Sequence, residues 1–380
     1  HRTEVKVQRI LTVILSGALS ALVSAPAMTQ VIETPARNAY VIDLATDTVL
    51  LSKKADVPMP PASMSKLMTV FMLFERLKKG SISLDDTFLV SEKAWKKGGS
   101  KMFVKVGDRV KVSDLLRGII VQSGNDACIV VAEGLGGSEE AFAEMMTRRA
   151  REIGLTNSTF ANATGWPHPN QLMSAEDLGK LSHRLITDFP ELYKIFNEKT
   201  FTYSKIKQSN RNPLLYRDIG ADGLKTGHTE AAGYGLTASA VRGGRRIVLV
   251  LNGMESVRQR SQESLRVMEW AFRTFKPYAL FKKDDVITTA DIWLGATSTV
   301  PLVIPEALKL TLSRDARAKM KVVVRMQNPV AAPVQKGQKL ATLVVSAPNF
   351  ETREIPLLAA ENVHQLGFMG RIGAAIKHVL

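Results

Sequence analysis

The chain has 380 residues, enough for two domains that each bury a core, and at 45% hydrophobic and 23% charged it has the composition of a globular protein. Its formal net charge of +15 would suit nucleic acid, an anionic membrane surface or an acidic polymer. Because the sequence has no zinc-ligand cluster, aromatic stacking motif or long Lys/Arg run, we interpret the charge as a generally basic surface and expect no nucleic-acid partner.

The first 27 residues have the pattern of an export signal. A basic start precedes the apolar run 10–23, and small residues follow at 25–27, the expected position for cleavage. The apolar run is short for a membrane span. We therefore predict that residues 1–27 are an export signal cleaved before Met28, with an uncleaved anchor as the alternative.

Residues 28–277 alternate between strand and helix signals, which predicts one α+β domain. Two short strands, 38–44 and 48–52, precede a helix that starts near Ser63. Strands joined by tight turns occupy 222–253, and helices fill the region between the two groups. We expect a single sheet built from both ends of the domain, with helices packed on it.

Serines mark the predicted starts of the intervening helices. Ser113 is expected to cap a helix that breaks at residues 122–125, and Ser138 and Ser174 to cap two later helices. We assign Ser174 this structural role and not a catalytic one.

Residues 278–360 predict a small all-β domain of sandwich type. Alternating, β-branched segments of strand length are separated by Pro and Gly, and no helical period appears before residue 360. The segment contains no cluster of nucleophile, base or metal ligands. We therefore expect it to act as a spacer or an interaction domain.

Residues 361–380 predict an amphipathic helix. Apolar residues from Leu366 to Val379 recur at three- and four-residue steps, and basic residues supply the opposite side. Such a tail can lie in an anionic membrane interface. The alternatives are packing on the β-domain and disorder, since its glycines weaken a helix in water.

Ser63 and Lys66 lie three residues apart, which places both side chains on one face of a helix. A serine at the positive end of a helix, one turn from an amine, can become nucleophilic without a histidine. The alternative is a helix cap and a solvated lysine, because Ser-x-x-Lys is short enough to occur by chance.

Two further motifs favour catalysis. Ser123-Gly124-Asn125 lies at a break between helices, where a hydroxyl and an amide can project into a cleft. Lys225-Thr226-Gly227 lies on a predicted strand, whose alternation puts the lysine and the glycine on one face, and we expect the glycine to permit close substrate approach. Penicillin-binding proteins and class A β-lactamases carry motifs of this kind in this order.

With these motifs the chain resembles the low-molecular-mass penicillin-binding D-alanyl-D-alanine carboxypeptidases over about residues 36–360. The matching segments are 62–69, 123–127, 162–165, 210–215, 225–234 and 260–264. The resemblance implies a penicillin-binding or β-lactamase-like domain with an antiparallel sheet and a helical cluster, followed by the β-domain. It also implies an exported, periplasmic enzyme whose amphipathic tail attaches it peripherally to the outer face of the inner membrane.

The resemblance implies a role for each motif residue. Ser63 attacks the carbonyl between the two terminal D-alanines of a peptidoglycan pentapeptide and forms an acyl-enzyme, while Lys66 accepts its proton. Ser123 relays a proton to the departing amine, and Asn125 binds the substrate amide. Backbone N–H groups of Ser63 and His228 form an oxyanion hole.

The terminal carboxylate of the substrate is assigned to Lys225, Thr226 and Arg260, beside Gly227. Burial and the ammonium of Lys225 are expected to lower the pKa of Lys66. No cofactor is implied. The histidines at 168, 183 and 228 show no ligand spacing, so we also expect no metal.

Three alternatives stay open. A serine β-lactamase uses the same nucleophile, but Gly124 stands where β-lactamases usually carry aspartate, and Glu176 lacks the Glu-x-x-x-Asn context of a deacylating carboxylate. We therefore predict slow release of β-lactams, which would act as covalent inhibitors. A DD-endopeptidase is disfavoured by the β-domain and tail, and an inactive murein-binding scaffold by the intact motif side chains.

Overall fold

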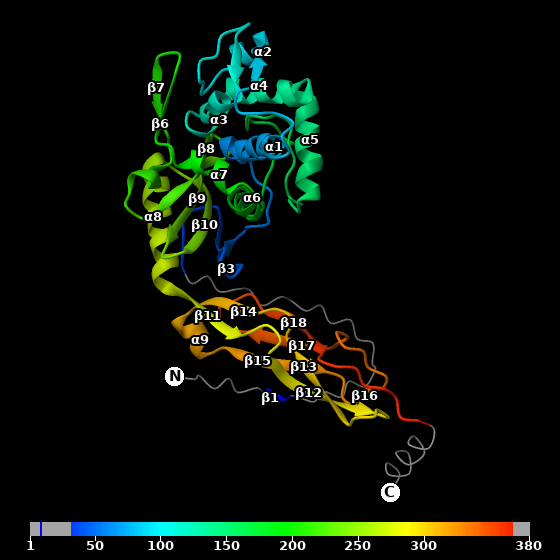
Figure 1. Ribbon diagram of the computed structural model, residues 1–380. Helices are drawn as coiled ribbons and strands as arrows, with labels where there is room; N and C mark the ends of the chain where they lie inside the picture. Colours follow the sequence, from blue (N-terminus) through cyan, green and yellow to red (C-terminus); the bar gives the residue numbers. More distant parts are fainter. Residues whose placement is uncertain (1–7, 10–31, 368–380) are drawn as a thin grey trace. The chain divides into compact units, whose positions relative to one another are not determined.

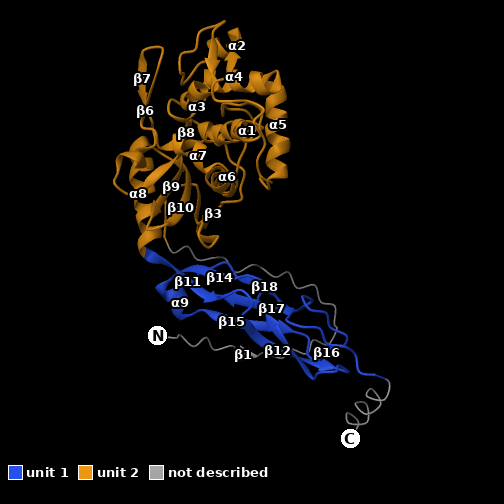
Figure 2. Cartoon of the chain, viewed as in Figure 1, with its two compact units in different colours: residues 1–29, 274–380 blue, residues 30–273 orange. Residues whose placement is uncertain are grey.

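The computed structural model describes residues 8–9 and 32–367, and the chain divides into two compact units after Arg273 (Figure 2). In the order of description, the first unit is residues 30–273, labelled unit 2 and orange in Figure 2, and the second is the part labelled unit 1 and blue. The second unit begins at Thr274, a few residues before the expected boundary, because Phe275–Phe281 (β11) is a strand paired with Leu308–Ser313 (β14). Apart from Gln8 and Arg9, the predicted export signal lies outside the described residues.

The first unit contains an antiparallel sheet in the order β3-β2-β10-β9-β8. Its strands are β2 (Asn38–Asp43), β3 (Thr48–Lys53), β8 (Ala221–Thr229), β9 (Gly233–Arg242) and β10 (Arg245–Met254). Both ends of the domain contribute strands, which confirms the predicted fold class. All six residues of β2 are buried, as expected for a strand with helices over both faces of its sheet.

Helices and two small two-stranded sheets, β4-β5 and β6-β7, accompany the main sheet in this unit (Figure 1). The helical elements are η1 (Ala62–Ser65), α1 (Lys66–Lys78), α2 (Glu92–Lys96), α3 (Val112–Ile120), α4 (Asn125–Gly136), α5 (Glu139–Glu152), α6 (Ala175–Asp188), α7 (Pro190–Tyr193), η2 (Lys194–Asn197), η3 (Pro213–Tyr216) and α8 (Val257–Thr274). The short strands are β4 (Thr87–Leu89), β5 (Arg109–Lys111), β6 (Thr200–Tyr203) and β7 (Ile206–Ser209). α6 packs on β2 and β10, and α8 lies along the other side of the sheet.

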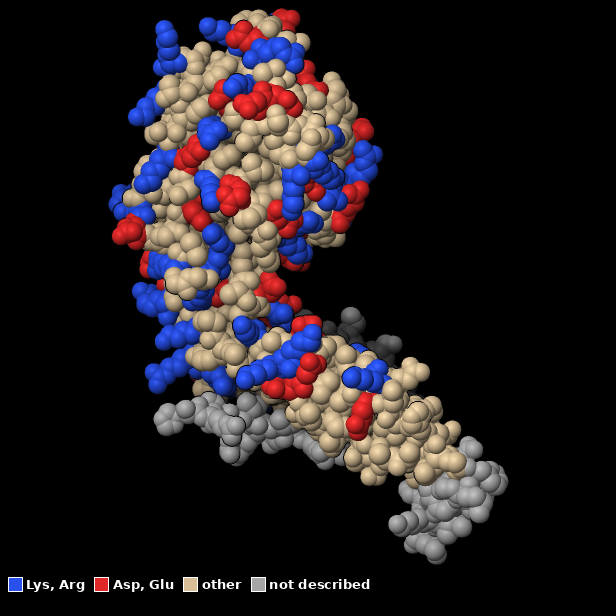
Figure 3. All heavy atoms as spheres, in the orientation of Figure 1, with Lys and Arg blue, Asp and Glu red and all other residues tan. Residues whose placement is uncertain are grey.

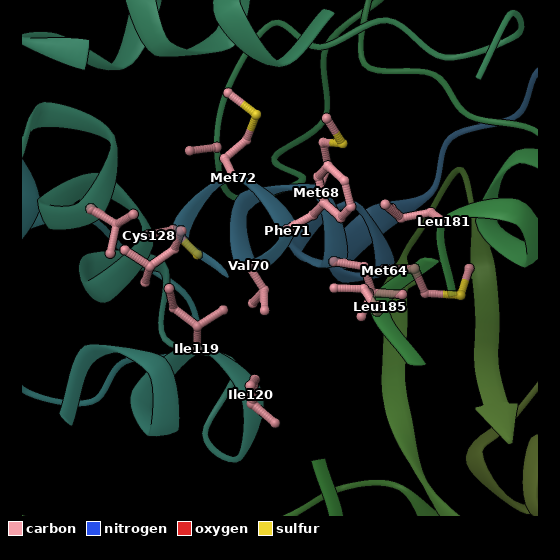
Figure 4. Packing of buried hydrophobic residues seen from close by; sticks show 14 of the residues in the cluster. Met64, Met68, Val70, Phe71, Met72, Ile119, Ile120, Cys128, Leu181 and Leu185 are labelled. Atoms are coloured by element: carbon pink, nitrogen blue, oxygen red, sulfur yellow. The ribbon is translucent and has the colours of Figure 1, made fainter. Parts of the chain in front are cut away.

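Helix α1 is the centre of the core. Every residue from Lys66 to Phe74 is buried, since the helix carries apolar side chains around most of its circumference. Figure 4 shows Ile119 and Cys128 of α3 and α4 on one side of α1 and Leu181 of α6 on the other. This packing fixes the start of α1, and with it the Ser-x-x-Lys motif, relative to both the helical cluster and the sheet.

Side-chain caps mark the starts of several helices. Ser138 Oγ and Ser174 Oγ accept hydrogen bonds from backbone N–H groups three residues on, which confirms both predicted caps. The predicted cap at Ser113 is wrong: α3 begins at Val112, directly after β5, and Ser113 lies inside it. The β6–β7 hairpin was not predicted, because its strands are short and mostly polar.

The second unit is an all-β domain, as predicted, with one short helix, α9 (Arg314–Ala318), that has too few residues to show a helical period. The larger sheet has the order β1-β15-β17-β18-β13-β12-β16. Its strands are β1 (Gln8–Arg9), β12 (Val286–Trp293), β13 (Thr299–Val303), β15 (Lys321–Met326), β16 (Val330–Ala331), β17 (Lys339–Ser346) and β18 (Arg353–Ala359). The domain has a hydrophobic core of its own, formed by alternate strand residues.

The predicted amphipathic tail is only partly described. Residues 361–367 are not helical, and Val363 and Gln365 instead form isolated bridges with Val334 and Gly295. Residues 368–380 of the tail lie outside the described residues. Among the helices that are described, none has the length and apolar character needed to cross a bilayer.

On the face of the first unit shown in Figure 3, Lys and Arg side chains alternate with Asp and Glu. The excess positive charge is therefore spread over this face and is not gathered into one basic stripe, which agrees with the interpretation of a generally basic surface.

Candidate active site

The helical segment begins next to Ser63, as predicted, but its first turn is a 3-10 turn. Pro60 and Pro61 end the preceding segment, η1 covers 62–65, and α1 begins at Lys66. The backbone of Ala62 has φ +51°, a left-handed conformation uncommon for a residue with a side chain. The turn leaves Ser63 half-buried while placing Lys66 directly beneath it.

Lys66 is 1% exposed, and its amine has two close oxygen partners. Its Nζ donates to Ser63 Oγ at 2.7 Å and to the Thr164 carbonyl oxygen at 2.7 Å. Burial lowers the pKa of Lys66 to about 8, and the Arg211 guanidinium acts in the same direction. The solvated lysine considered as an alternative is therefore excluded for this residue.

Ser123 and Lys225, 102 residues apart in sequence, form a second buried pair. Ser123 lies between α3 and α4 with φ +56°, and Lys225 Nζ on β8 donates to its Oγ at 3.0 Å. Burial drives the pKa of Lys225 well below its ordinary range, helped by the charge of Lys66. The repulsion between the two amines is mutual, so each disfavours the charged form of the other, as expected for Lys225 and Lys66.

Gly227 serves the packing of β8 and not the approach of a substrate. A Cβ at this position would lie 2.9 Å from the Pro61 carbonyl oxygen and 3.2 Å from Met64 Cγ. The absence of a side chain therefore lets β8 pack closely on the turn that holds Ser63. The preceding residue, Thr226, is also buried. This corrects the role predicted for the glycine.

Ser63, Asn125 and His228 line one pocket of about 330 Å³, together with Ser100 and the segment Thr164–Pro167. Asn125 Nδ2 donates to the Gly98 carbonyl oxygen at 2.9 Å, which holds the amide at the pocket wall. Lys66, Ser123 and Lys225 are buried. Lys66 is joined to the pocket by its hydrogen bond to Ser63, and Lys225 is bonded to Ser123, two residues before Asn125 of the pocket wall.

Arg260 is connected to the pocket through the ring of Tyr234. Its guanidinium carbon is 5.6 Å from the centre of the Tyr234 ring, which stacks on His228 at a centroid distance of 3.9 Å. Arg260 is only 7% exposed, and its Nε has no hydrogen-bond partner among the described residues. Burial lowers the pKa of Arg260.

The predictions missed the segments that shape the pocket. Asp126 is 1% exposed, and its carboxylate accepts backbone N–H bonds from Met102, Phe103 and Val104 at 2.9 to 3.1 Å. Gly165 has φ +87°, and a Cβ there would lie 2.0 Å from the Ala62 carbonyl oxygen. In the sequence, only two features pointed to these residues: Asp126 directly follows the Ser123-Gly124-Asn125 motif, and Gly165 lies in the matching segment 162–165.

Within residues 8–9 and 32–367, no three His, Cys, Asp or Glu side chains are grouped as they would be to hold a metal ion. The polar side chains of the site are instead two amines, two hydroxyls and an amide. This set suits nucleophilic catalysis with proton transfer.

Comparison with known proteins agrees with this geometry. A family model described as D-alanyl-D-alanine carboxypeptidase matches residues 23–256, which is more than half of the chain. The chain belongs to the D-alanyl-D-alanine carboxypeptidase family. A second model, described as penicillin-binding protein 5, C-terminal domain, matches residues 275–365 of this carboxypeptidase.

Individual relatives cover most of the carboxypeptidase. The D-alanyl-D-alanine carboxypeptidase DacC of Escherichia coli (strain K12) is 39% identical over 354 residues, 90% of this chain and 88% of the relative. Penicillin-binding protein 5 of Haemophilus influenzae is 32% identical, with a TM-score of 0.76 over 88% of this chain and 99% of the other. Penicillin-binding protein D2 of Listeria monocytogenes, in an ampicillin-bound form, is 29% identical, with a TM-score of 0.58 over 63% and 98%. The predicted family, fold class and enzyme class are thus confirmed.

Proposed function

We propose that Ser63 is the nucleophile of this carboxypeptidase and that Lys66 is the base that activates it. The observation that carries the proposal is the 2.7 Å contact between Lys66 Nζ and Ser63 Oγ. With a pKa near 8, a useful fraction of this amine is neutral at physiological pH. A neutral amine can donate one N–H to the Thr164 carbonyl oxygen and direct its lone pair at the Ser63 hydroxyl.

The proposed reaction has two steps. Ser63 Oγ bonds to the carbonyl carbon between the terminal D-alanines of a peptidoglycan pentapeptide, and its proton passes to Lys66. Backbone N–H groups of Ser63 and His228 stabilise the oxyanion until the C–N bond breaks and Ser123 delivers a proton to the departing D-alanine. Lys66 then returns a proton to Ser123 and is neutral again. Water attacks the ester carbonyl carbon and gives a proton to Lys66, which passes it to Ser63 Oγ as the ester C–O bond breaks.

Lys225, Thr226 and Arg260 would hold the carboxylate of the leaving residue. The unpartnered, buried Nε of Arg260 supports this role, because a carboxylate would supply the missing acceptor. A bound carboxylate would also return the pKa of Lys225 toward its ordinary value. Such a site selects a chain terminus over an internal bond, and Asn125 would bind the amide of the retained part.

Two measurements on the purified chain test this function. D-alanine should be released from a pentapeptide, and benzylpenicillin should add its full mass to the chain at the peptide that contains Ser63. The ampicillin-bound form of the Listeria protein supports the second expectation. Rapid steady-state hydrolysis of penicillin would favour the β-lactamase alternative, and cleavage of cross-linked peptides in preference to the pentapeptide would favour the endopeptidase.

The rate of acylation should rise with pH through about 8. Lys66 must be neutral to accept the proton, and burial lowers its pKa to about 8, so the active form is lost as pH falls. At pH 6, kcat/KM should be about one-hundredth of its value on the alkaline plateau. The measurement is a pH profile of D-alanine release between pH 6 and 10; a flat profile over this range would contradict the role of Lys66.

We further propose that the enzyme is exported, periplasmic and attached peripherally to the outer face of the inner membrane. The support is the basic and apolar pattern of residues 1–27 and the amphipathic pattern of residues 361–380. The cell-wall substrate is chemically consistent with such a location.

Removal of the tail should abolish membrane binding and spare catalysis. The full chain is expected to float with vesicles of anionic phospholipid, whereas a chain that ends at Gly367 stays at the bottom of the gradient, because a basic amphipathic helix binds by apolar burial and surface charge. Both chains should release D-alanine at the same rate. Equal flotation of the two chains would show that the tail is not the anchor.

A further inference from the structure

The hairpin formed by β6 and β7 projects from the first unit beside α3, and its two faces differ (Figure 1). The inner face carries Phe201 and Tyr203, which are half-buried and pack against the hydrophobic core. Strand alternation gives the other face four polar residues that form two cross-strand pairs and are all exposed. We call this surface the hairpin face; its residues are Thr200, Thr202, Lys207 and Ser209.

Two side-chain hydrogen bonds fix the hairpin to segments of the catalytic site. Gln122, the residue before Ser123, is 1% exposed, and its Nε2 donates to the Phe201 carbonyl oxygen at 3.0 Å. Gln208 Nε2 donates to the Lys101 carbonyl oxygen at 2.8 Å. A two-stranded hairpin is only marginally stable by itself, so these bonds help to hold the hairpin face in one orientation. A surface that is ordered in advance loses less entropy when it binds.

The hairpin face continues toward the catalytic pocket. Lys207 and Ser209 lie on one side of β7, and Arg211, two residues further along the chain, is also exposed. Arg211 Nη1 donates to Ser100 Oγ at 2.8 Å, and Ser100 lines the pocket that contains Ser63. Polar side chains therefore connect the hairpin to the edge of the pocket.

The chemistry of the hairpin face suits a hydrated, anionic polymer. Its side chains are three hydroxyls and one ammonium, and none of them forms a hydrogen bond or ion pair with another described residue. Hydroxyls donate and accept, and an ammonium donates, so together they match the hydroxyl, amide and carboxylate groups of a sugar–peptide polymer. Each stem peptide with a free end also carries a carboxylate, whose charge is complementary to Lys207 and Arg211.

The same composition disfavours two other classes of partner. The centre of a protein–protein interface is enriched in apolar and aromatic side chains and depleted in Lys and Ser. A surface that binds a membrane buries apolar side chains among the lipids. The hairpin face consists of Thr200, Thr202, Lys207 and Ser209 and has no large apolar side chain to supply either kind of contact.

We propose that the hairpin face binds a neighbouring segment of the sugar–peptide polymer that carries the pentapeptide being cut. The inference rests on the proposed function, which identifies the polymer. The hairpin face is then an accessory binding surface outside the catalytic pocket. It increases activity on the polymer, and not on an isolated peptide, because a tethered substrate has a high effective concentration at the pocket.

The test compares insoluble peptidoglycan rich in pentapeptides with the soluble tripeptide diacetyl-L-lysyl-D-alanyl-D-alanine. The variant combines Lys207→Glu with Ser209→Glu, and the readout is the rate of D-alanine release below saturation. Release from the polymer should fall about tenfold, because attraction is replaced by repulsion. Release from the tripeptide should stay within about twofold of the unmodified rate, as expected for exposed positions. Salt at about 0.3 M should reduce the difference between the variant and the unmodified chain, since it screens exposed charges.

A matched control combines Lys79→Glu with Ser81→Glu, the same changes at the same spacing in an exposed segment after α1. It should leave both rates unchanged. The proposal is overturned if the hairpin variant degrades the polymer at the unmodified rate, if the control loses as much activity on the polymer, or if the hairpin variant loses activity equally on both substrates.

The other partner and the proposed function have separate outcomes. Unchanged release from the polymer together with weaker flotation on anionic vesicles would assign the hairpin face to a membrane, and the proposal would be wrong. Failure of the unmodified chain to release D-alanine from the tripeptide would instead overturn the proposed function.

Discussion

Replacing Ser63 by alanine is expected to lower kcat for D-alanine release by roughly 10⁴- to 10⁶-fold, as loss of the nucleophile does in other serine hydrolases. The substitution removes the atom that forms the acyl bond, while the half-buried position tolerates the smaller side chain. The same variant should show no mass increase with benzylpenicillin. Release of D-alanine and intact mass after incubation with the antibiotic measure the two effects.

Ser83→Ala provides the control for this substitution, since Ser83 is exposed in a loop of the same unit. It should retain both the activity and the adduct, and thermal unfolding should show that both variants are folded. If Ser63→Ala still releases D-alanine at a comparable rate, or still carries the penicillin adduct, the nucleophile has been misassigned. The inactive-scaffold alternative would then regain support.

Replacing Lys66 by arginine is expected to lower the rate of acylation by about 10³-fold or more, within the range typical of a lost general base. Arginine keeps the positive charge and much of the volume, but its pKa lies above 12, so it cannot accept the proton of Ser63. The residue is 1% exposed, so a permanent charge there should also lower the melting temperature. Single-turnover acylation by benzylpenicillin and thermal unfolding separate the two effects.

Lys78→Arg is the matched control, because Lys78 lies at the exposed end of the same helix. It should acylate at the unmodified rate. The pH dependence gives a second check: any residual acylation in Lys66→Arg should no longer rise through pH 8. A variant that acylates within tenfold of the unmodified chain, with the same pH profile, would exclude Lys66 as the base.

Contacts between residues close in sequence could be predicted, whereas contacts between distant motifs of the site could not. Ser63 and Lys66 are three residues apart, and any helical turn brings such a pair onto one face, so their contact follows from local geometry. Lys225 and Ser123 are 102 residues apart, and their contact depends on how β8 packs against the break between α3 and α4. The sequence indicated that Ser123 and Lys225 belong to one site only because the order of the motifs resembles that of a known family.

The role predicted for Gly227 was wrong because the sequence does not show which atoms surround the glycine. A glycine in an active-site motif was interpreted as room for substrate, whereas the space is occupied by the Pro61 carbonyl oxygen. The structural role of Asp126 was missed because its partners are distant in the sequence. Its three backbone partners belong to residues 102–104, a segment without regular secondary structure that no periodicity connects to α4.

By itself the sequence determined the α+β class, the separate β-domain, most helix starts and the identity of the motif side chains. These depend on periodicity, turn residues and caps, which act within a few residues along the chain. Only the tertiary structure decided that Lys66 is buried enough to have a pKa near 8, that the Arg211 guanidinium supports this shift, and that Lys225 and Ser123 form a second buried pair. Desolvation and long-range contacts arise when distant segments pack together, so no local pattern contains them.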